Sequence, residues 1–228
     1  MSKPTCSLCQ FWHSSIGKKI IVALTGAVLA AFLLGHLTGN LLMYVGAEAF
    51  NEYAEFLHNM LHGVGVWIAR ISLLTCLVLH VAATISLVRA NNTAKGQNYE
   101  KAETSVASGS SRIMVWSGLT ILAFVIFHIL HFTTRNTSAR LKELGDTGDA
   151  YQMVIEGFLS IPVSLFYIIA ISLLCSHLSH GVASIFQTLG LRTRNNASLI
   201  NGFAKGYTAL IWVGFISIPV AVLADIIK

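Results

Sequence analysis

The sequence predicts an all-α integral membrane protein, a single domain over residues 1–228 with five transmembrane helices. Of its 228 residues, 54% are hydrophobic and only 11% are charged, whereas a soluble domain carries about 25% charged residues. Five apolar blocks reach about 20 residues, which is the length that crosses the hydrocarbon core of a bilayer. The chain has a net charge of +5, but long apolar blocks dominate it, so we expect no nucleic-acid partner.

The five predicted spans cover residues 20–45, 66–88, 113–132, 161–186 and 206–227. None of them shows the two-residue alternation of a membrane β-barrel strand. The first block is too long for a cleavable signal peptide. Cys6 and Cys9 form a single CxxC pair, which we interpret as incidental because no second pair accompanies it.

Lys and Arg residues are distributed unequally between the two sides of the predicted bundle. One side holds ten of the fifteen: Lys3, Lys18, Lys19, Arg89, Lys95, Lys101, Arg112, Arg192, Arg194 and Lys205. Basic residues near the span ends mark the cytoplasmic side. The N-terminus is therefore expected in the cytoplasm and the C-terminus outside.

The connecting segments differ in character. Residues 46–62 have apolar side chains at helical spacing, so an interfacial amphipathic helix is predicted there. Residues 133–160 are expected to combine loop with a short helix, and residues 91–111 to form a polar cytoplasmic loop.

Four histidines lie inside predicted spans, one in each of the first four. His36 lies roughly 24 Å and His128 roughly 22 Å along outward-running helices, so these two share an outer level. His80 and His177 lie roughly 21 Å and 24 Å along inward-running helices and share an inner level. Imidazoles on facing helices are what bis-histidine haem iron requires. The first four spans are therefore predicted to form a haem-binding bundle.

Two histidine doublets leave the choice of ligand open on spacing alone. His128 and His131 lie on one helical face, and so do His177 and His180. A histidine-lined metal permease is an alternative, although such transporters usually carry intramembrane carboxylates and spans one to four contain none. A purely structural anchor would not need this many buried imidazoles.

Several motifs resemble one family along essentially the whole chain. They are FLLGHLTGN around His36, GAEAFNEYAEFL, LVLH at His80, FVIFHILHF at His128 and SHLSHGVASIFQTLG at His177. These resemble the membrane cytochrome b subunit of succinate dehydrogenase and fumarate reductase, in the five-helix, di-haem, single-anchor type of menaquinone-using bacteria. The segment that follows His177 is the most specific part of the resemblance.

The resemblance implies two haem b groups. It implies His36 and His128 as ligands of the distal haem iron and His80 and His177 as ligands of the proximal one. The resemblance implies that His131 and His180 are not iron ligands themselves and lie next to the histidines that are. The implied location is the bacterial inner membrane.

The resemblance also implies the partners and the reaction. A flavoprotein with FAD and an iron–sulfur subunit would bind on the cytoplasmic face, and higher oligomers of the complex are compatible with this. The chain would pass electrons between the iron–sulfur subunit and menaquinone, as part of an enzyme complex but with no dehydrogenase site of its own. The alternative is a cytochrome b anchor of another respiratory dehydrogenase, such as a hydrogenase or formate dehydrogenase.

Quinone chemistry also moves protons, so an acid or imidazole is expected near the outer haem. Glu55 is the candidate by analogy with an acidic residue that the family uses before its second helix. Glu48, Glu52, His58 and His62 are rivals, and a solvated acidic helix face is the alternative interpretation. Guanidinium groups favour carboxylates, so the arginines that flank the spans are candidates to pair with haem propionates: Arg70, Arg112 and Arg135.

One position departs from the family pattern. Some fumarate reductases of this type carry a glutamate two residues before the helix-four ligand, where this chain has Cys175. That glutamate is proposed to let protons accompany electrons across the membrane. The resemblance therefore implies that electron transfer here is coupled to the membrane potential.

Overall fold

The structure, a computed structural model, describes residues 7–94 and 106–228, and these form helices and connecting turns without strands. Cys6 and residues 95–105 of the predicted cytoplasmic loop lie outside the described residues. The elements in chain order are α1 (Ser7–His13), α2 (Ser15–Asn40), η1 (Leu41–Tyr44), α3 (Ala47–Asn59), α4 (Val64–Ala94), α5 (Val106–His128), η2 (Ile129–Thr133), α6 (Ala139–Asp146), α7 (Ala150–Leu159), α8 (Ile161–Thr188) and α9 (Ala197–Leu223).

Five helices of the described part are long and apolar enough to cross a membrane, which confirms the predicted spans. Their lipid-facing sides are apolar, and on α4 the side chains of Ile68, Leu74 and Val78 are each more than half exposed. Exposed apolar side chains at this density are expected where lipid replaces water as the solvent. The chain is therefore a multi-pass membrane protein by the length and composition of its helices.

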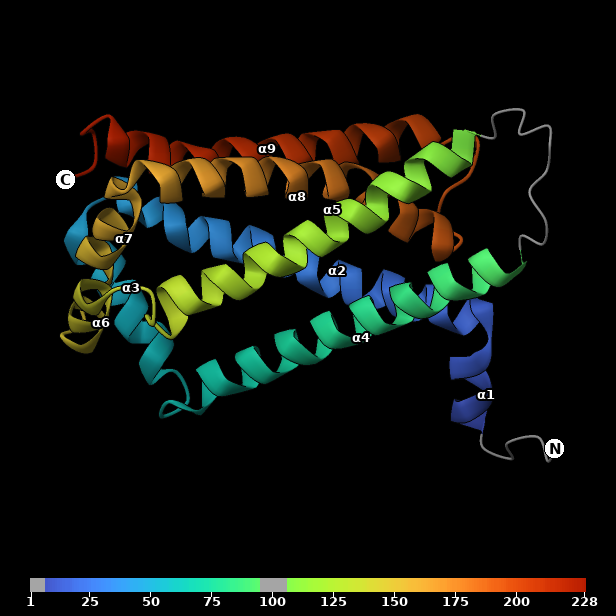
Figure 1. Ribbon diagram of the computed structural model, residues 1–228, viewed down its shortest axis with the longest axis horizontal. Coiled ribbons are helices and arrows are strands. Elements are labelled where there is room, and N and C mark those ends of the chain that lie inside the picture. Colours follow the sequence, from blue (N-terminus) through green and yellow to red (C-terminus); the bar gives the residue numbers. More distant parts are fainter. Residues whose placement is uncertain (1–6, 95–105) are drawn as a thin grey trace.

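The long helices lie roughly side by side, with α2 at the centre (Figure 1). α4 packs mainly on α2, α5 packs on α8, and α9 packs on both α8 and α2. The α2–α9 contact is close, because a Cβ at Gly214 would lie 2.6 Å from the Leu37 side chain. The Tyr207 hydroxyl also donates to the Ala30 carbonyl of α2, at 2.6 Å.

Short helices cover one end of the bundle, where α3, α6, α7 and the C-terminus lie (Figure 1). The N-terminal helix α1 and the α8–α9 connection lie at the opposite end. The predicted amphipathic helix at residues 46–62 is confirmed as α3. Residues 133–160 contain two short helices, α6 and α7, where only one was predicted.

Several helices extend beyond the predicted apolar blocks. The fifth span begins at Ala197 rather than residue 206, and its prediction was late because Asn201, Gly202 and Lys205 lower the local hydropathy. The connection before α9 is held by its own polar groups, since the Asn196 carboxamide accepts from the Thr193 N–H at 2.7 Å. Residues 91–94 and 106–111 are helical, so the predicted polar loop is shorter.

Candidate functional site

The four predicted ligand histidines lie on four different helices. His36 is on α2, His80 on α4, His128 at the end of α5 and His177 on α8. All four side chains are partly buried. α4 packs on α2, and α5 packs on α8. Each predicted histidine pair therefore has one member on α2 or α4 and the other on α5 or α8.

The rings of the outer pair lie close together. The imidazole centroids of His36 and His128 are 5.8 Å apart, and the ring planes are inclined by 79°. Because a metal–imidazole bond is about 2 Å long, two imidazoles on opposite sides of one iron have ring centres roughly 6 Å apart. The spacing of His36 and His128 therefore fits a bis-histidine iron.

The inner pair is held by small residues on the helices opposite each ring. His80 packs against Gly26, where an added Cβ would lie 3.2 Å from the imidazole Cε1. His177 faces Gly118, with a corresponding distance of 3.8 Å. Two glycines thus make room for the inner rings between α2, α4, α5 and α8.

A hydroxyl group lies beside Nδ1 of His80. The Thr25 hydroxyl donates its single proton to the Ile21 carbonyl at 2.6 Å, and its oxygen lies 3.2 Å from His80 Nδ1. When the Thr25 proton lies on the Ile21 carbonyl, the hydroxyl oxygen accepts from His80, and this corresponds to the tautomer with the proton on Nδ1. In that tautomer His80 Nε2 keeps the lone pair that a metal ligand needs.

A similar pair of hydrogen-bond contacts occurs at His177. The Ser117 hydroxyl donates to the Met114 carbonyl at 3.1 Å and lies 3.2 Å from His177 Nδ1. When the Ser117 proton lies on the Met114 carbonyl, the imidazole donates from Nδ1 and Nε2 is the unprotonated nitrogen. Both inner histidines thus contact, through Nδ1, a hydroxyl on a neighbouring helix. A hydrogen bond at the second ring nitrogen is also what orients histidine ligands of metals.

At the outer level, one tyrosine contacts both His128 and His131. The Tyr167 hydroxyl lies 3.3 Å from His128 Nδ1 and 3.0 Å from His131 Nδ1. A phenol can accept from one imidazole and donate to the other. If His128 donates and His131 accepts, His128 Nε2 is the nitrogen that remains free for iron. His131 is 4% exposed and acts as a buried partner of Tyr167.

Local winding of the backbone explains why both histidines reach Tyr167. α5 ends at His128, and Ile129–Thr133 continues as a π-helical turn, in which the Thr134 N–H bonds to the Ile129 carbonyl at 2.8 Å. A π-turn inserts an extra residue into a helix and is frequent at functional sites. Here it changes the direction of the His131 side chain relative to a regular helix.

His36 is the exception among the four histidines. Its Nδ1 lies 3.3 Å from the Asn40 amide nitrogen, which also donates to the His36 carbonyl at 2.7 Å. An amide nitrogen only donates, so this contact favours a proton on Nε2 of His36. Iron binding through that nitrogen therefore requires the Asn40 amide to move away from Nδ1. The ring itself is held by stacking on Phe32, with centroids 5.3 Å apart.

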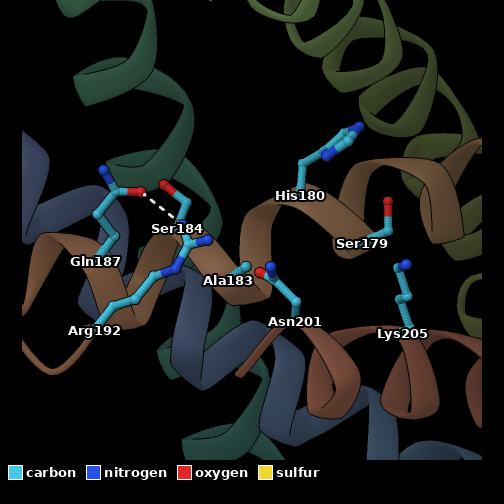
Figure 2. Close-up of a pocket in the computed structure, with 8 residues that line it drawn as sticks. All are labelled: Ser179, His180, Ala183, Ser184, Gln187, Arg192, Asn201 and Lys205. Carbon is cyan, nitrogen blue, oxygen red and sulfur yellow. Dashed lines mark hydrogen bonds between the residues drawn. The ribbon is translucent and has the colours of Figure 1, made fainter. Parts of the chain in front are cut away.

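His180 forms no hydrogen bond with His177, the other histidine of its doublet. His180 is exposed and lines a cavity between α8 and α9. Its ring points away from Asn201 and Lys205 (Figure 2). Cys175, at the position that departs from the family pattern, is a buried thiol, 4% exposed.

The quinone-site candidates lie on the exposed side of the short-helix end. Glu55 is exposed on α3, where its carboxylate accepts from the Asn59 amide at 3.5 Å. The rival acids and histidines in this region are exposed as well: Glu48, Glu52, His58 and His62.

The flanking arginines have partners within the chain. Arg70 lies over the Trp67 ring, with 5.1 Å between its guanidinium carbon and the ring centroid. Arg135 forms an ion pair with Asp146 at 3.4 Å, and its buried Nε has no hydrogen-bond partner among the described residues. That Nε–H is free to donate to an anionic oxygen. The Arg112 side chain lies outside the described residues.

Sequence reasoning missed Thr25, Ser117 and Tyr167. Each carries a hydroxyl inside an apolar span, and this is the signal that could have marked them. Within residues 7–94 and 106–228, no three His, Cys, Asp or Glu side chains gather as a conventional metal cluster. A bis-histidine iron needs only two protein ligands. Compared with known protein families, with curated proteins and with solved structures, the chain matches none.

Proposed function

We propose that this chain is the di-haem b membrane anchor of a succinate:menaquinone oxidoreductase. It would pass electrons between an iron–sulfur subunit and membrane quinone. The supporting observation is the placement of four imidazoles on four helices, with the rings of His36 and His128 5.8 Å apart and a hydroxyl at Nδ1 of both inner histidines. The resemblance described above supports the choice of succinate and fumarate as the partner enzyme's substrates.

In this proposal His36 and His128 hold the iron of the distal haem, and His80 and His177 hold that of the proximal haem. When bound, the two haems supply one-electron transfer at two levels of the membrane. Thr25 and Ser117 orient the inner imidazoles, and Tyr167 orients the outer ring of His128. The chain thereby supplies spacing, orientation and electrostatics, while the cofactors supply the redox chemistry.

The proposed surroundings follow the sequence analysis. The chain would lie in a bacterial inner membrane with its N-terminus in the cytoplasm. A flavoprotein with FAD and an iron–sulfur subunit would bind at the end of the bundle that carries α1. Menaquinone would react at the opposite end, where Glu55 is the candidate to exchange protons with it.

Haem stoichiometry in histidine variants tests the proposal. We expect two haem b per chain in the purified complex, with His36→Ala losing only the distal haem and His80→Ala only the proximal one. His58→Ala is the matched control, because His58 is exposed and bonds only to the Ala54 carbonyl of its own helix. Reduced-minus-oxidised spectra during a redox titration would report which haem is lost. A purified wild-type complex without haem b would rule the proposal out.

The co-purified subunits identify the enzyme. A flavoprotein that oxidises succinate is expected to accompany the chain. Co-purification of a hydrogenase or formate dehydrogenase subunit would be compatible with the two proposed haems, but it would show that the partner enzyme does not act on succinate.

A further inference from the structure

A groove runs along the outer side of α8 and α9, away from the four ligand histidines. A cavity of about 360 Å³ opens near the α8–α9 connection, and its polar end is formed by Gln187, Arg192, Asn201 and Lys205 (Figure 2). A second cavity, of about 320 Å³, adjoins the first and shares Ser179 and Lys205 with it. We call the two together the α8–α9 groove.

The polar end of the groove is cationic, and no carboxylate of the described residues forms an ion pair with it. The segment from residue 157 to residue 224 contains no Asp or Glu, and its charges are Arg192, Arg194 and Lys205. Arg192 donates to the neutral Gln187 side chain at 3.2 Å. The ion pairs among the described residues leave both Arg192 and Lys205 without a carboxylate. This end of the groove therefore suits an anionic group.

The deeper end of the groove is apolar in character. Three of the polar side chains that line it already have partners: the Thr208 hydroxyl donates to the Ala204 carbonyl at 2.7 Å, the Trp212 indole to Ser172 at 3.0 Å and the Ser179 hydroxyl to the Ser176 carbonyl at 2.8 Å. Ala209 is the small residue between Thr208 and Trp212, and it too lines this end. The surface left for a ligand here is hydrocarbon, which suits a chain of methylene groups.

The apolar part of the groove, from Lys205 to Trp212, is short enough to lie within one leaflet of a bilayer. Lys205 lies eight residues into α9 and Trp212 seven residues further, which places them roughly 12 Å and 22 Å along the helix from Ala197. Half of the hydrocarbon core is about 15 Å thick. A lysine at this depth can extend its head towards the interface.

We propose that the α8–α9 groove binds one phospholipid with an anionic headgroup. The headgroup phosphate lies between Arg192 and Lys205, and one acyl chain lies along Ala209 towards Trp212. Basic pockets between transmembrane helices on the cytoplasmic side are suited to such headgroups, and the positive-inside distribution assigns this end to the cytoplasm. The apolar deep end favours a lipid over an acidic segment of a soluble subunit. The proposal does not depend on haem.

Native mass spectrometry of the intact chain, purified with its bound cofactors and subunits in non-ionic detergent, tests this. The probes are dimyristoyl phosphatidylglycerol, dimyristoyl phosphatidylcholine and inorganic phosphate. We expect the phosphatidylglycerol to bind in preference, and the double variant Arg192→Gln/Lys205→Gln to lower its affinity roughly tenfold or more. Arg192→Lys should retain most of the affinity because the charge is kept.

Two further variants distinguish a bound phospholipid from a bound free phosphate ion. Ala209→Phe fills the part of the groove proposed for the acyl chain, so it should weaken lipid binding. The binding of inorganic phosphate alone should stay unchanged. Lys19→Gln/Arg89→Gln is the matched control, because it removes two exposed charges from other helices. Equal binding of the two lipids, or an equal loss in the control, would overturn the proposal. Displacement of the lipid by phosphate with no effect of Ala209→Phe would also overturn it, in favour of a free-anion site.

Discussion

His36 on α2 and His128 at the end of α5 face each other edge to face, with 5.8 Å between their ring centroids. Their Nδ1 atoms meet different partners: a carboxamide at His36 and a phenol at His128. The inner histidines both meet aliphatic hydroxyls that have already donated their proton. Because hydrogen bonds at the second nitrogen tune the basicity of a histidine ligand, haems bound at the two levels as proposed would differ in redox potential.

Removing the hydroxyls at the inner level should weaken the proximal haem alone. Thr25→Val and Ser117→Ala each remove the hydroxyl that lies beside an imidazole Nδ1, so we expect haem affinity at that level to fall roughly 10- to 100-fold. Thr25→Ser should behave like wild type because the hydroxyl is retained. Thr208→Val is a matched control, since its hydroxyl bonds only within α9. Haem titration of each variant gives the affinity, and equal weakening in the control would contradict the role of Thr25.

Tyr167→Phe tests the outer level. The substitution keeps the aromatic packing but removes the only hydroxyl that contacts both His128 and His131. We expect the midpoint potential of the distal haem to shift while that of the proximal haem stays unchanged. Tyr207→Phe removes a hydroxyl bonded to the Ala30 carbonyl instead and should move neither potential. A redox titration in which both haems shift in Tyr167→Phe would assign the tyrosine to the bundle as a whole.

Spans and ligand candidates could be predicted because each depends on local sequence. An apolar block long enough to cross the membrane is visible in the chain, and so is a histidine inside it. The hydroxyl partners could not be predicted, because Thr25 and His80 are 55 residues apart and Ser117 and His177 are 60 apart. Their meeting depends on how the helices pack. The π-turn after His128 likewise has no signal in the hydropathy pattern.

Cys175 leads to a prediction about the membrane potential. A buried thiol stands where some fumarate reductases of the family that the chain resembles carry a carboxylate, so under the proposed function no proton would accompany the electron at this position. Electrons that move outward from the cytoplasmic side are driven by an inside-negative potential, at about 2.3 kcal/mol per charge per 100 mV. Succinate oxidation by menaquinone should therefore slow when an uncoupler collapses the potential of proteoliposomes that contain the complex. A rate indifferent to the potential would show that the transfer is electroneutral.

Gly214→Ala should disturb the position of α2, and with it the outer ligand His36. A Cβ at Gly214 would come within 2.6 Å of Leu37, which follows His36 and is 2% exposed. Overpacking of this kind costs about 1–3 kcal/mol, so thermal unfolding in detergent should occur at a lower temperature. Gly202→Ala is the matched control on the same helix, because nothing lies within 4 Å of its added Cβ. Replacing a helical glycine by alanine in open space should stabilise by roughly 0.5–1 kcal/mol. Equal unfolding temperatures for the two variants would show that α9 can move away from Leu37 at no cost, and the distal haem spectrum would then be unchanged in both.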